Sequence, residues 1–217
     1  MKKAIILANG DSPKKSEILY FLKKGYLKII CADGGANSAQ KLGIIPDVII
    51  GDLDSITRQN LKLFSGKTEV INYTRQNDTD VEKALKYLIS EKYKEVILLG
   101  ATGDRLDHTI CNLGIIIKFF NKIKISVLHK KSFLTAHNSD IKLKTIPKEI
   151  ISIYGFDDKT KVTSKGLKYP LKNIALPFGK KESTSNVAMG DEIELKIKNG
   201  IMFLIRDFNI LKRNDLI

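Results

Sequence analysis

The sequence predicts an α/β domain followed by an antiparallel β domain, and two patterns support this. Through residue 126, short apolar runs alternate with amphipathic segments of helical period. This is typical of a mostly parallel, Rossmann-like sheet with helices on both faces. Beyond it, single apolar residues alternate with polar ones and glycines recur at turn spacing, as in an antiparallel β-sandwich. We therefore expect two domains, residues 1–126 and 127–217.

The strands of the first domain are predicted from five apolar runs: residues 4–7, 27–31, 48–50, 68–73 and 96–99. Between them, Ser12 and Pro13 predict an N-cap with proline at the first helical position of a helix that ends near Lys24. Further helices are expected over 37–42 and 57–64. Thr79 and Glu82 have the spacing of a capping box, which predicts a helix start.

The last helix of this domain carries apolar residues at steps of four and three, which predict its buried face: Leu106, Ile110, Leu113, Ile117 and Phe120. In the second domain, Ile193, Leu195 and Ile197 alternate with charged residues. Apolar runs over 149–156 and 201–208 predict further strands, and no helix is expected there.

The charge balance first suggests a polyanionic partner, since 37 Lys and Arg against 24 Asp and Glu give a net charge of +13. The distribution weakens that interpretation. Residues 1–126 carry 20 basic and 14 acidic side chains and residues 127–217 carry 17 and 10, without a basic arm at either end. Only five of the basic residues are arginine, the better residue for guanine and phosphate contacts. We expect no specific nucleic acid, and a basic nucleic-acid-binding protein stays a remote alternative.

Two cysteines, Cys31 and Cys111, are too few for a disulfide framework or a metal cluster, which favours a reducing, cytoplasmic location. Both are expected to be buried. No apolar segment is long enough to span a bilayer, and no signal peptide is expected.

Carboxylates follow four successive predicted strands: Asp33, then Asp52 and Asp54, then Asp78 and Asp80, then Asp104 and Asp107. Parallel strands bring these positions to one edge of the sheet, where ligands of such folds bind. Like charges gathered there need a cation, and oxygen ligands without His or Cys suit Mg²⁺ shared with phosphates. Neighbouring glycines and Arg105 offer phosphate contacts. The pattern predicts metal-assisted phosphoryl chemistry on a nucleotide.

Each of these residues alone is an ordinary turn or cap residue, and Asp80 could simply favour a helix N-terminus. His108 has a direct role or packs in the core. No P-loop, dinucleotide fingerprint or nucleophile elbow occurs. A different magnesium-dependent, nucleotide-using phosphotransferase or hydrolase is the alternative enzyme.

The motifs resemble those of the thiamine pyrophosphokinase family in order and spacing. They are Cys31-Ala-Asp-Gly-Gly-Ala-Asn37, Pro46-Asp-Val-Ile-Ile-Gly-Asp-Leu-Asp-Ser55, Thr79-Asp80, Gly103-Asp-Arg-Leu-Asp-His108, Gly166-Leu-Lys-Tyr-Pro-Leu171, Phe178-Gly179 and Ser183-Thr-Ser-Asn186. The resemblance implies transfer of the β,γ-diphosphate of ATP to thiamine, giving thiamine diphosphate and AMP with Mg²⁺. It also implies a homodimer with shared active sites, each formed by the α/β domain of one subunit and the β domain of the other.

The resemblance also implies residue roles. Metal ligands would be Asp52, Asp54 and Asp80, with Asp54, Asp80 and Arg105 catalytic. The nucleotide would lie against Asp33, Gly34, Gly35, Gln76, Thr79, Arg105, Asp107 and His108. Thiamine would be held by Thr184, Ser185 and Asn186. One departure is Asn77, which stands where the family usually has an aspartate three residues before the position of Asp80.

Overall fold

The computed structural model describes residues 1–74 and 77–217. The chain divides into two compact units, Met1–His129 and Lys130–Ile217. The first unit ends with strand β6 (Lys124–His129), whereas the boundary expected after residue 126 lies within that strand. In the described residues, no helix is both long and apolar enough to cross a membrane.

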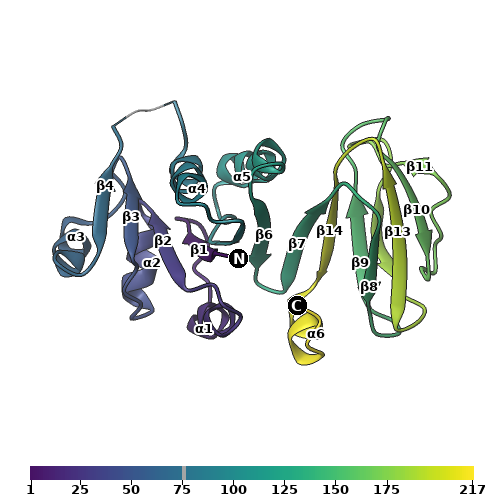
Figure 1. The fold of residues 1–217 in the computed structure, drawn as a ribbon, viewed down its shortest axis with the longest axis horizontal. Helices are drawn as coiled ribbons and strands as arrows, with labels where there is room; N and C mark the ends of the chain where they lie inside the picture. Colours follow the sequence, from purple (N-terminus) through teal and green to yellow (C-terminus); the bar gives the residue numbers. More distant parts are fainter. Residues whose placement is uncertain (75–76) are drawn as a thin grey trace. The chain divides into compact units, whose positions relative to one another are not determined.

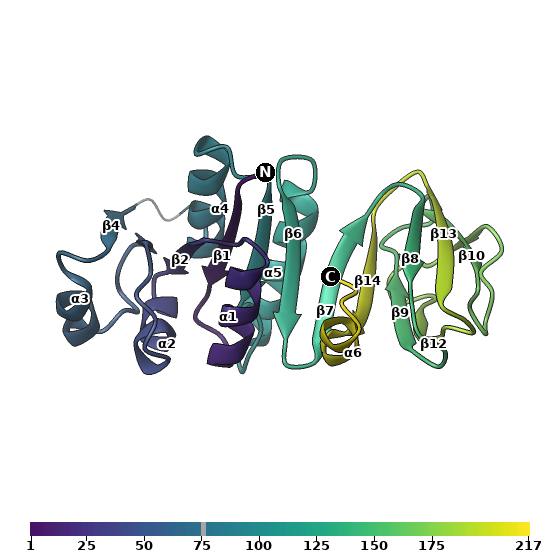
Figure 2. The same cartoon turned by 60° about the horizontal axis from the view of Figure 1, so that its bottom comes forward.

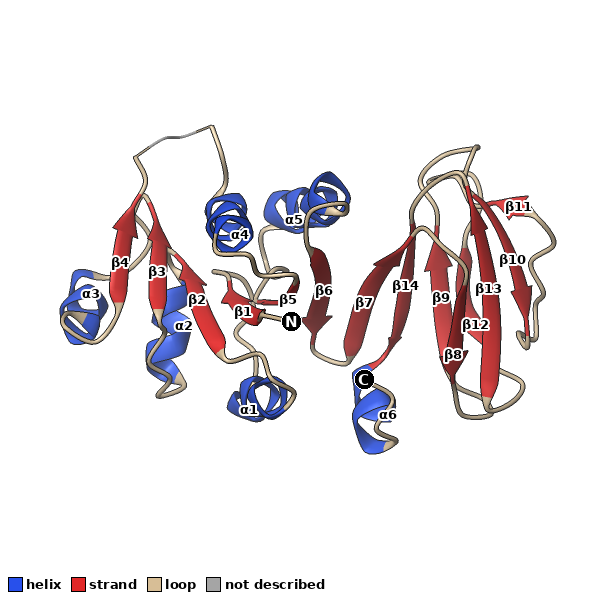
Figure 3. Ribbon diagram, in the orientation of Figure 1, coloured by secondary structure: helices blue, strands red, loops and turns tan. Residues whose placement is uncertain are grey.

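The first unit is a parallel sheet with helices on both faces (Figures 1 and 3). Its strand order is β6-β5-β1-β2-β3-β4, and every neighbouring pair is parallel. The other strands are β1 (Lys3–Leu7), β2 (Lys28–Ala32), β3 (Val48–Gly51), β4 (Glu69–Asn72) and β5 (Glu95–Leu99). Helices α4 (Asp80–Ser90) and α5 (Leu106–Phe119) lie on one face, and α1 (Lys15–Lys23) and α2 (Gly35–Lys41) on the other; α3 is Arg58–Phe64.

The central strands β1, β2 and β5 are buried at every position after the first, as their continuous apolar runs predicted. Strand β4 lies at the edge and is largely exposed. Because all six strands point the same way, the residues that follow them meet at one edge of the sheet.

Two helix predictions of the first unit are wrong. Helix α1 begins at Lys15 rather than at Pro13, because the Glu17 carboxylate accepts the backbone N–H of Lys14 at 2.9 Å and so sets the N-cap there. The buried face of α5 is formed by Asn112, Ile115, Ile116 and Phe119. Leu106 and Ile110 are 68% and 63% exposed. This helix is apolar on several sides, so the spacing alone could not choose its buried face.

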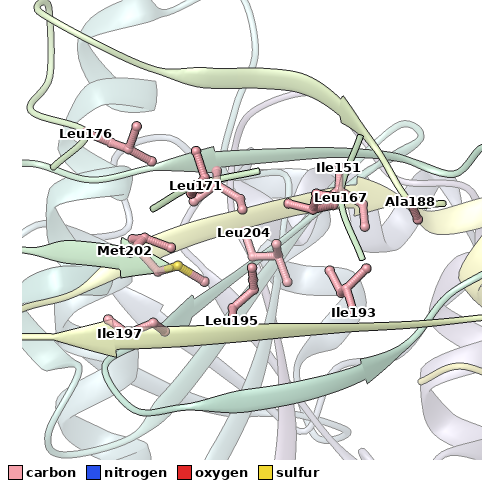
Figure 4. Close-up of a cluster of buried hydrophobic side chains, with 12 residues drawn as sticks. Ile151, Leu167, Leu171, Leu176, Ala188, Ile193, Leu195, Ile197, Met202 and Leu204 are labelled. Carbon is pink, nitrogen blue, oxygen red and sulfur yellow. The ribbon is translucent and has the colours of Figure 1, made fainter. Parts of the chain in front are cut away.

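The second unit consists of two antiparallel sheets, ordered β12-β9-β14-β7 and β11-β10-β13-β8. The strands are β7 (Ser132–His137), β8 (Ile141–Lys144), β9 (Ile150–Tyr154), β10 (Lys161–Lys165), β11 (Ile174–Ala175), β12 (Ser183–Val187), β13 (Glu192–Lys198) and β14 (Met202–Asp207). As predicted, Ile193, Leu195 and Ile197 point inward, into a shared apolar cluster (Figure 4).

A short C-terminal helix, α6 (Phe208–Arg213), was not expected in this unit. The Asp207 side chain accepts the backbone N–H groups of Asn209 and Ile210, which starts the helix. Phe208 packs against Phe133 with ring centroids 6.2 Å apart, and the helix lies beside β14 (Figure 2). The apolar run over 201–208 therefore contains both a strand and a helix start.

Candidate active site

Three carboxylates meet at the carboxyl-terminal edge of the parallel sheet. Asp33 follows β2, Asp52 follows β3, and Asp80 is the first residue of α4. One carboxylate oxygen from each lies within 4.8 Å of the other two, which makes this group a possible cation site. The family resemblance implied Asp52, Asp54 and Asp80 as metal ligands and Asp33 as a nucleotide contact; the structure brings Asp33, Asp52 and Asp80 together. We call this group the acidic cluster.

Asp33 is the buried member of the acidic cluster, with 1% of its surface exposed. Its carboxylate accepts the backbone N–H groups of Ser55 at 2.9 Å and Ile56 at 3.1 Å. Burial raises its pKa, the nearby charge of Asp80 acts in the same direction, and the two N–H donors oppose them. Asp33 also adopts a positive φ of 40°. The backbone N–H groups of Ser55 and Ile56 therefore fix the position of the Asp33 carboxylate, and Asp33 in turn holds the loop that contains these two residues.

The same loop is held a second time by Asn37, in helix α2. The Asn37 amide nitrogen donates to the carbonyl of Ser55 at 2.9 Å, while its oxygen accepts the N–H of Thr57 at 3.1 Å and the amide of Asn60 at 2.8 Å. The segment that carries Asp52 is therefore tied to α2 by side chains. The motif that contains Asn37 does not by itself predict this role.

Asp54 lies on this loop but outside the group of three carboxylates that approach one another within 4.8 Å. It is exposed, and its Oδ1 accepts the hydroxyl of Ser55 at 2.8 Å. That hydrogen bond, followed by one with Asp33, lowers the pKa of Asp54. Asp54 is therefore an exposed carboxylate at the rim of the acidic cluster, and its hydrogen bonds favour the charged form.

Two glycines allow the close approach of backbone segments at this edge. A Cβ on Gly51, the last residue of β3, would lie 2.7 Å from the Cβ of Asp33 and 3.0 Å from Oδ1 of Asp80. A Cβ on Gly35 would lie 1.9 Å from the carbonyl oxygen of Leu7. Any side chain at these positions would separate the carboxylates or push α2 away from β1.

Lys83 is a site residue that the sequence pattern did not predict. It lies one turn into α4, is buried, and its Nζ contacts Oδ1 of Asp80 at 2.7 Å. The spacing of three residues between an acid and a lysine is common on exposed helices, so nothing in the sequence marked this pair as buried. A cation thus stands beside the acidic cluster.

Thr79 caps α4, as the sequence predicted. Its hydroxyl accepts the N–H of Glu82 at 3.2 Å, and the Glu82 carboxylate accepts the N–H of Thr79 at 3.1 Å. Lys118 of α5 pairs with the other oxygen of Glu82. Next to the cap, Asn77 is exposed, and Asp78 pairs with Lys86 at 2.6 Å. The expected nucleotide contact Gln76 lies outside the described residues.

The acidic cluster opens into a cavity of about 630 Å³. Its walls include residues that follow each of the five strands β1 to β5, among them Gly10, Gly34, Asp52, Thr79, Thr102, Gly103, Arg105, Asp107 and His108. The hydroxyl oxygen of Thr102 is buried in this wall without a hydrogen-bond partner among the described residues. Backbone amides at strand ends and helix starts are suited to phosphate oxygens.

Arg105 is at the N-cap of α5 and lines the cavity. Asp107 accepts from its Nε at 3.2 Å and its Nη2 at 2.5 Å, and this pairing raises the pKa of Arg105 and lowers that of Asp107. The side chain of His108 is 62% exposed and its Nε2 lies 3.9 Å from Asp107. A core role for His108 is thus wrong. Cys111 is also exposed, contrary to expectation, and Cys31 is buried.

The expected thiamine residues lie on β12, at the edge of its sheet. The Thr184 hydroxyl is 3.0 Å from the Tyr154 hydroxyl, and Ser185 has a φ of 55° in an irregular part of the strand. Asn186 is 1% exposed, and its amide bonds both the N–H and the carbonyl of Tyr169. Asn186 therefore holds the Tyr169 backbone from within the second unit.

The first unit, considered alone, has the features of a nucleotide-binding α/β enzyme: a parallel sheet, a cavity at its carboxyl-terminal edge, and carboxylates that can hold a divalent cation. The comparisons with known proteins identify the family. Residues 21–127 match the model described as thiamin pyrophosphokinase, catalytic domain, and residues 138–202 match the vitamin B1 binding domain of the same enzyme.

Related proteins extend this match over most of the chain. Thiamin pyrophosphokinase 1 of Caenorhabditis elegans is 29% identical over 191 residues, covering 81% of this chain and 77% of its own. Thiamine pyrophosphokinase of Bacillus subtilis is 29% identical over 184 residues, covering 82% and 86%. A crystal structure of a Bacillus subtilis thiamine pyrophosphokinase superposes with a TM-score of 0.82 at 25% identity, over 95% of this chain and 99% of that one.

The chain belongs to the thiamin pyrophosphokinase family. Members of this family are ATP-dependent diphosphotransferases, and the resemblance stated from the motifs is confirmed. The predicted fold class, a parallel α/β unit followed by an antiparallel β unit, is confirmed as well.

Proposed function

We propose that this protein transfers the β,γ-diphosphate of ATP to the hydroxyl group of thiamine, with Mg²⁺, and releases AMP. The observation that carries the proposal is the acidic cluster in the lining of the cavity, in a chain of this family. Transfer of phosphoryl groups depends on positioning and charge neutralisation, and the cavity offers groups for both.

The donor set suits magnesium. The acidic cluster consists of carboxylate oxygens without a histidine or cysteine, and hard oxygen ligands of this kind favour Mg²⁺. We assign Asp52 and Asp80 as ligands. Asp54 is the expected third ligand at the rim of the acidic cluster. Asp33 supports the loop that follows β3 by accepting the N–H groups of Ser55 and Ile56. A bound magnesium ion would neutralise charge on the phosphates and polarise their oxygens.

The protein's own groups would orient the nucleotide and handle one proton. We assign the backbone at Gly34 and Gly103 and the guanidinium of Arg105 as phosphate contacts, because all three line the cavity. The thiamine hydroxyl must lose its proton as its oxygen bonds to the β-phosphorus and the bond from that phosphorus to the AMP oxygen breaks. The carboxylate oxygens of Asp54 and Asp80 are the two candidates to accept that proton.

In the second unit, Thr184 and Ser185 are the proposed thiamine contacts. Asn186 acts differently in this proposal, because its buried amide is bonded within the unit; it would position the Tyr169 segment rather than touch the substrate. A substitution of Asn186 should therefore affect folding as well as thiamine affinity.

We extend the proposal to a homodimer whose active sites are shared between subunits, which rests on the family resemblance. Mixing an Asp80→Asn protein with a Ser185→Leu protein would test it. If sites are shared, the mixture regains activity that neither variant has alone. A mixture as inactive as its components, with subunit exchange verified, would contradict shared sites.

The two cysteines without a disulfide support a reducing, cytoplasmic location.

The test of the reaction is substitution of the two candidate carboxylates. Asp80→Asn and Asp54→Asn should each lower thiamine-dependent AMP formation by about 100-fold or more while the protein stays folded. Asp158→Asn is the control, because Asp158 is exposed in the second unit and pairs only with Lys180 among the contacts described. Retained activity in Asp80→Asn would remove that residue from the site. Riboflavin, pyridoxine and water as acceptors distinguish the alternative kinases and hydrolases.

A further inference from the structure

Lys83 occupies a position that is unfavourable for a lysine unless a specific partner is present. It lies in the first turns of α4, where the helix dipole repels positive charge, and only 5% of its side chain is exposed. In the described part of the chain, the buried cationic residues are Lys83 and Arg206. Arg206 forms two hydrogen bonds with buried Glu149. The corresponding partner of Lys83 is Asp80 of the acidic cluster.

The carboxylates near Lys83 outnumber it. Asp80 contacts it at 2.7 Å, and Asp80, Asp33 and Asp52 each bring an oxygen within 4.8 Å of the others. Its charge also acts on Asp54 at the rim. One ammonium group therefore balances only part of the negative charge collected at this edge of the sheet. The remainder is what a divalent cation would neutralise.

We propose that Lys83 is a positioning residue: a resident cation that holds Asp80 and keeps the acidic cluster assembled before a divalent cation binds. This inference rests on the metal site of the proposed function. Lys83 and the metal neutralise the same carboxylates, so each cation stabilises the acidic cluster less when the other is present. By linkage, removing the lysine charge must strengthen metal binding, and metal must restore the stability that the removal costs.

The structure provides a matched control on the same helix. Lys86 also pairs with an aspartate, Asp78 at 2.6 Å, but its side chain is 51% exposed. Lys86 is not among the cavity residues. Lys83→Met keeps the unbranched side chain and removes the charge, while Lys83→Arg keeps the charge. Lys86→Met removes a charge from an exposed pair.

The experiment measures the melting temperature of the full chain in EDTA and over a Mg²⁺ titration, together with direct binding of Mn²⁺ alone by electron paramagnetic resonance. In EDTA, Lys83→Met should melt about 5 °C below the unsubstituted protein, and saturating Mg²⁺ should remove at least half of that deficit. Mn²⁺ should bind the variant about fivefold more tightly or better. Lys83→Arg and Lys86→Met should follow the unsubstituted protein.

Three results would overturn the inference. A deficit of the same size at every Mg²⁺ concentration would make Lys83 a structural residue only. Unchanged or weaker Mn²⁺ binding in Lys83→Met would also make Lys83 a structural residue only. If Lys83→Met does not fold, Lys83→Gln is measured in its place. Absence of Mn²⁺ binding in the unsubstituted protein would refute the metal site itself, and with it this role of Lys83. Binding that is present but insensitive to Lys83 would refute the inference alone.

Discussion

Gly51→Ala tests the geometry of the acidic cluster with the smallest possible change. The added methyl group would lie 2.7 Å from the Cβ of Asp33 and 3.0 Å from Oδ1 of Asp80. Carbon atoms in contact are normally about 3.5–4.0 Å apart, so one of the two aspartates must move by about 1 Å. Asp33 cannot move freely, because Ser55 and Ile56 hold its carboxylate. The displacement therefore passes to Asp80 or to the end of β3.

The magnitude follows from the displacement. A shift of about 1 Å in a catalytic constellation costs about 100-fold in rate, which corresponds to about 2.7 kcal/mol in transition-state free energy. Overpacking should also lower the free energy of unfolding by about 1–3 kcal/mol. The backbone of Gly51 is not in the positive-φ region, so these losses come from the methyl contacts and not from an altered backbone preference.

The assay compares kcat/KM for thiamine-dependent AMP formation and the melting temperature in Gly51→Ala and Gly114→Ala. Gly114 lies within α5 with no atom within 4 Å of an added Cβ, so alanine there should stabilise the helix by about 1 kcal/mol. Full activity and unchanged stability in Gly51→Ala would show that the close approach of Gly51 to Asp33 and Asp80 is not required.

Three further predictions concern local interactions. Thr79→Ala removes the cap of α4 and should lower the free energy of unfolding by about 1 kcal/mol in chemical denaturation, and an unchanged midpoint would contradict the cap. Arg206→Met leaves Glu149 buried without its cation and should cost about 3–5 kcal/mol by the same measurement, so a loss below about 1 kcal/mol would argue against this ion pair. Hydrogen bonds from Thr160, chiefly its backbone N–H, lower the pKa of Asp157, so its contribution to stability is present above the unfolded pKa near 3.8 and is lost as the pH falls further. Asp157→Asn should therefore flatten the decline of stability below about pH 4, and an equally steep decline would contradict this.

The fold was predictable because its main signals are local. Buried parallel strands such as β1 and β5 are continuous apolar runs, and apolar and polar residues alternate along β13. The pattern over a few consecutive residues was therefore sufficient to predict these strands. Helix α5 was mispredicted at its buried face because its apolar residues surround much of the helix. In that case only the tertiary contacts determine which side is buried.

The candidate site was predictable only in part. Aspartates after parallel strands must meet at one edge, so their order alone grouped Asp33, Asp52 and Asp80. The same argument also grouped Asp54, Asp78, Asp104 and Asp107, which lie outside the acidic cluster, because order does not show how far each side chain reaches. Lys83 and Asn37 could not be found this way. The role of Lys83 depends on a buried ion pair with Asp80, and that of Asn37 on hydrogen bonds to Ser55, Thr57 and Asn60. The local sequence around both is that of ordinary helix residues.

The central claim is that ATP gives up its β,γ-diphosphate as one unit to thiamine. The most direct measurement is the identification of products by chromatography after incubation of the protein with ATP, thiamine and Mg²⁺. We expect thiamine diphosphate and AMP in equal amounts, with neither formed when thiamine or Mg²⁺ is omitted. ADP with thiamine monophosphate, or AMP formed without thiamine, would contradict it.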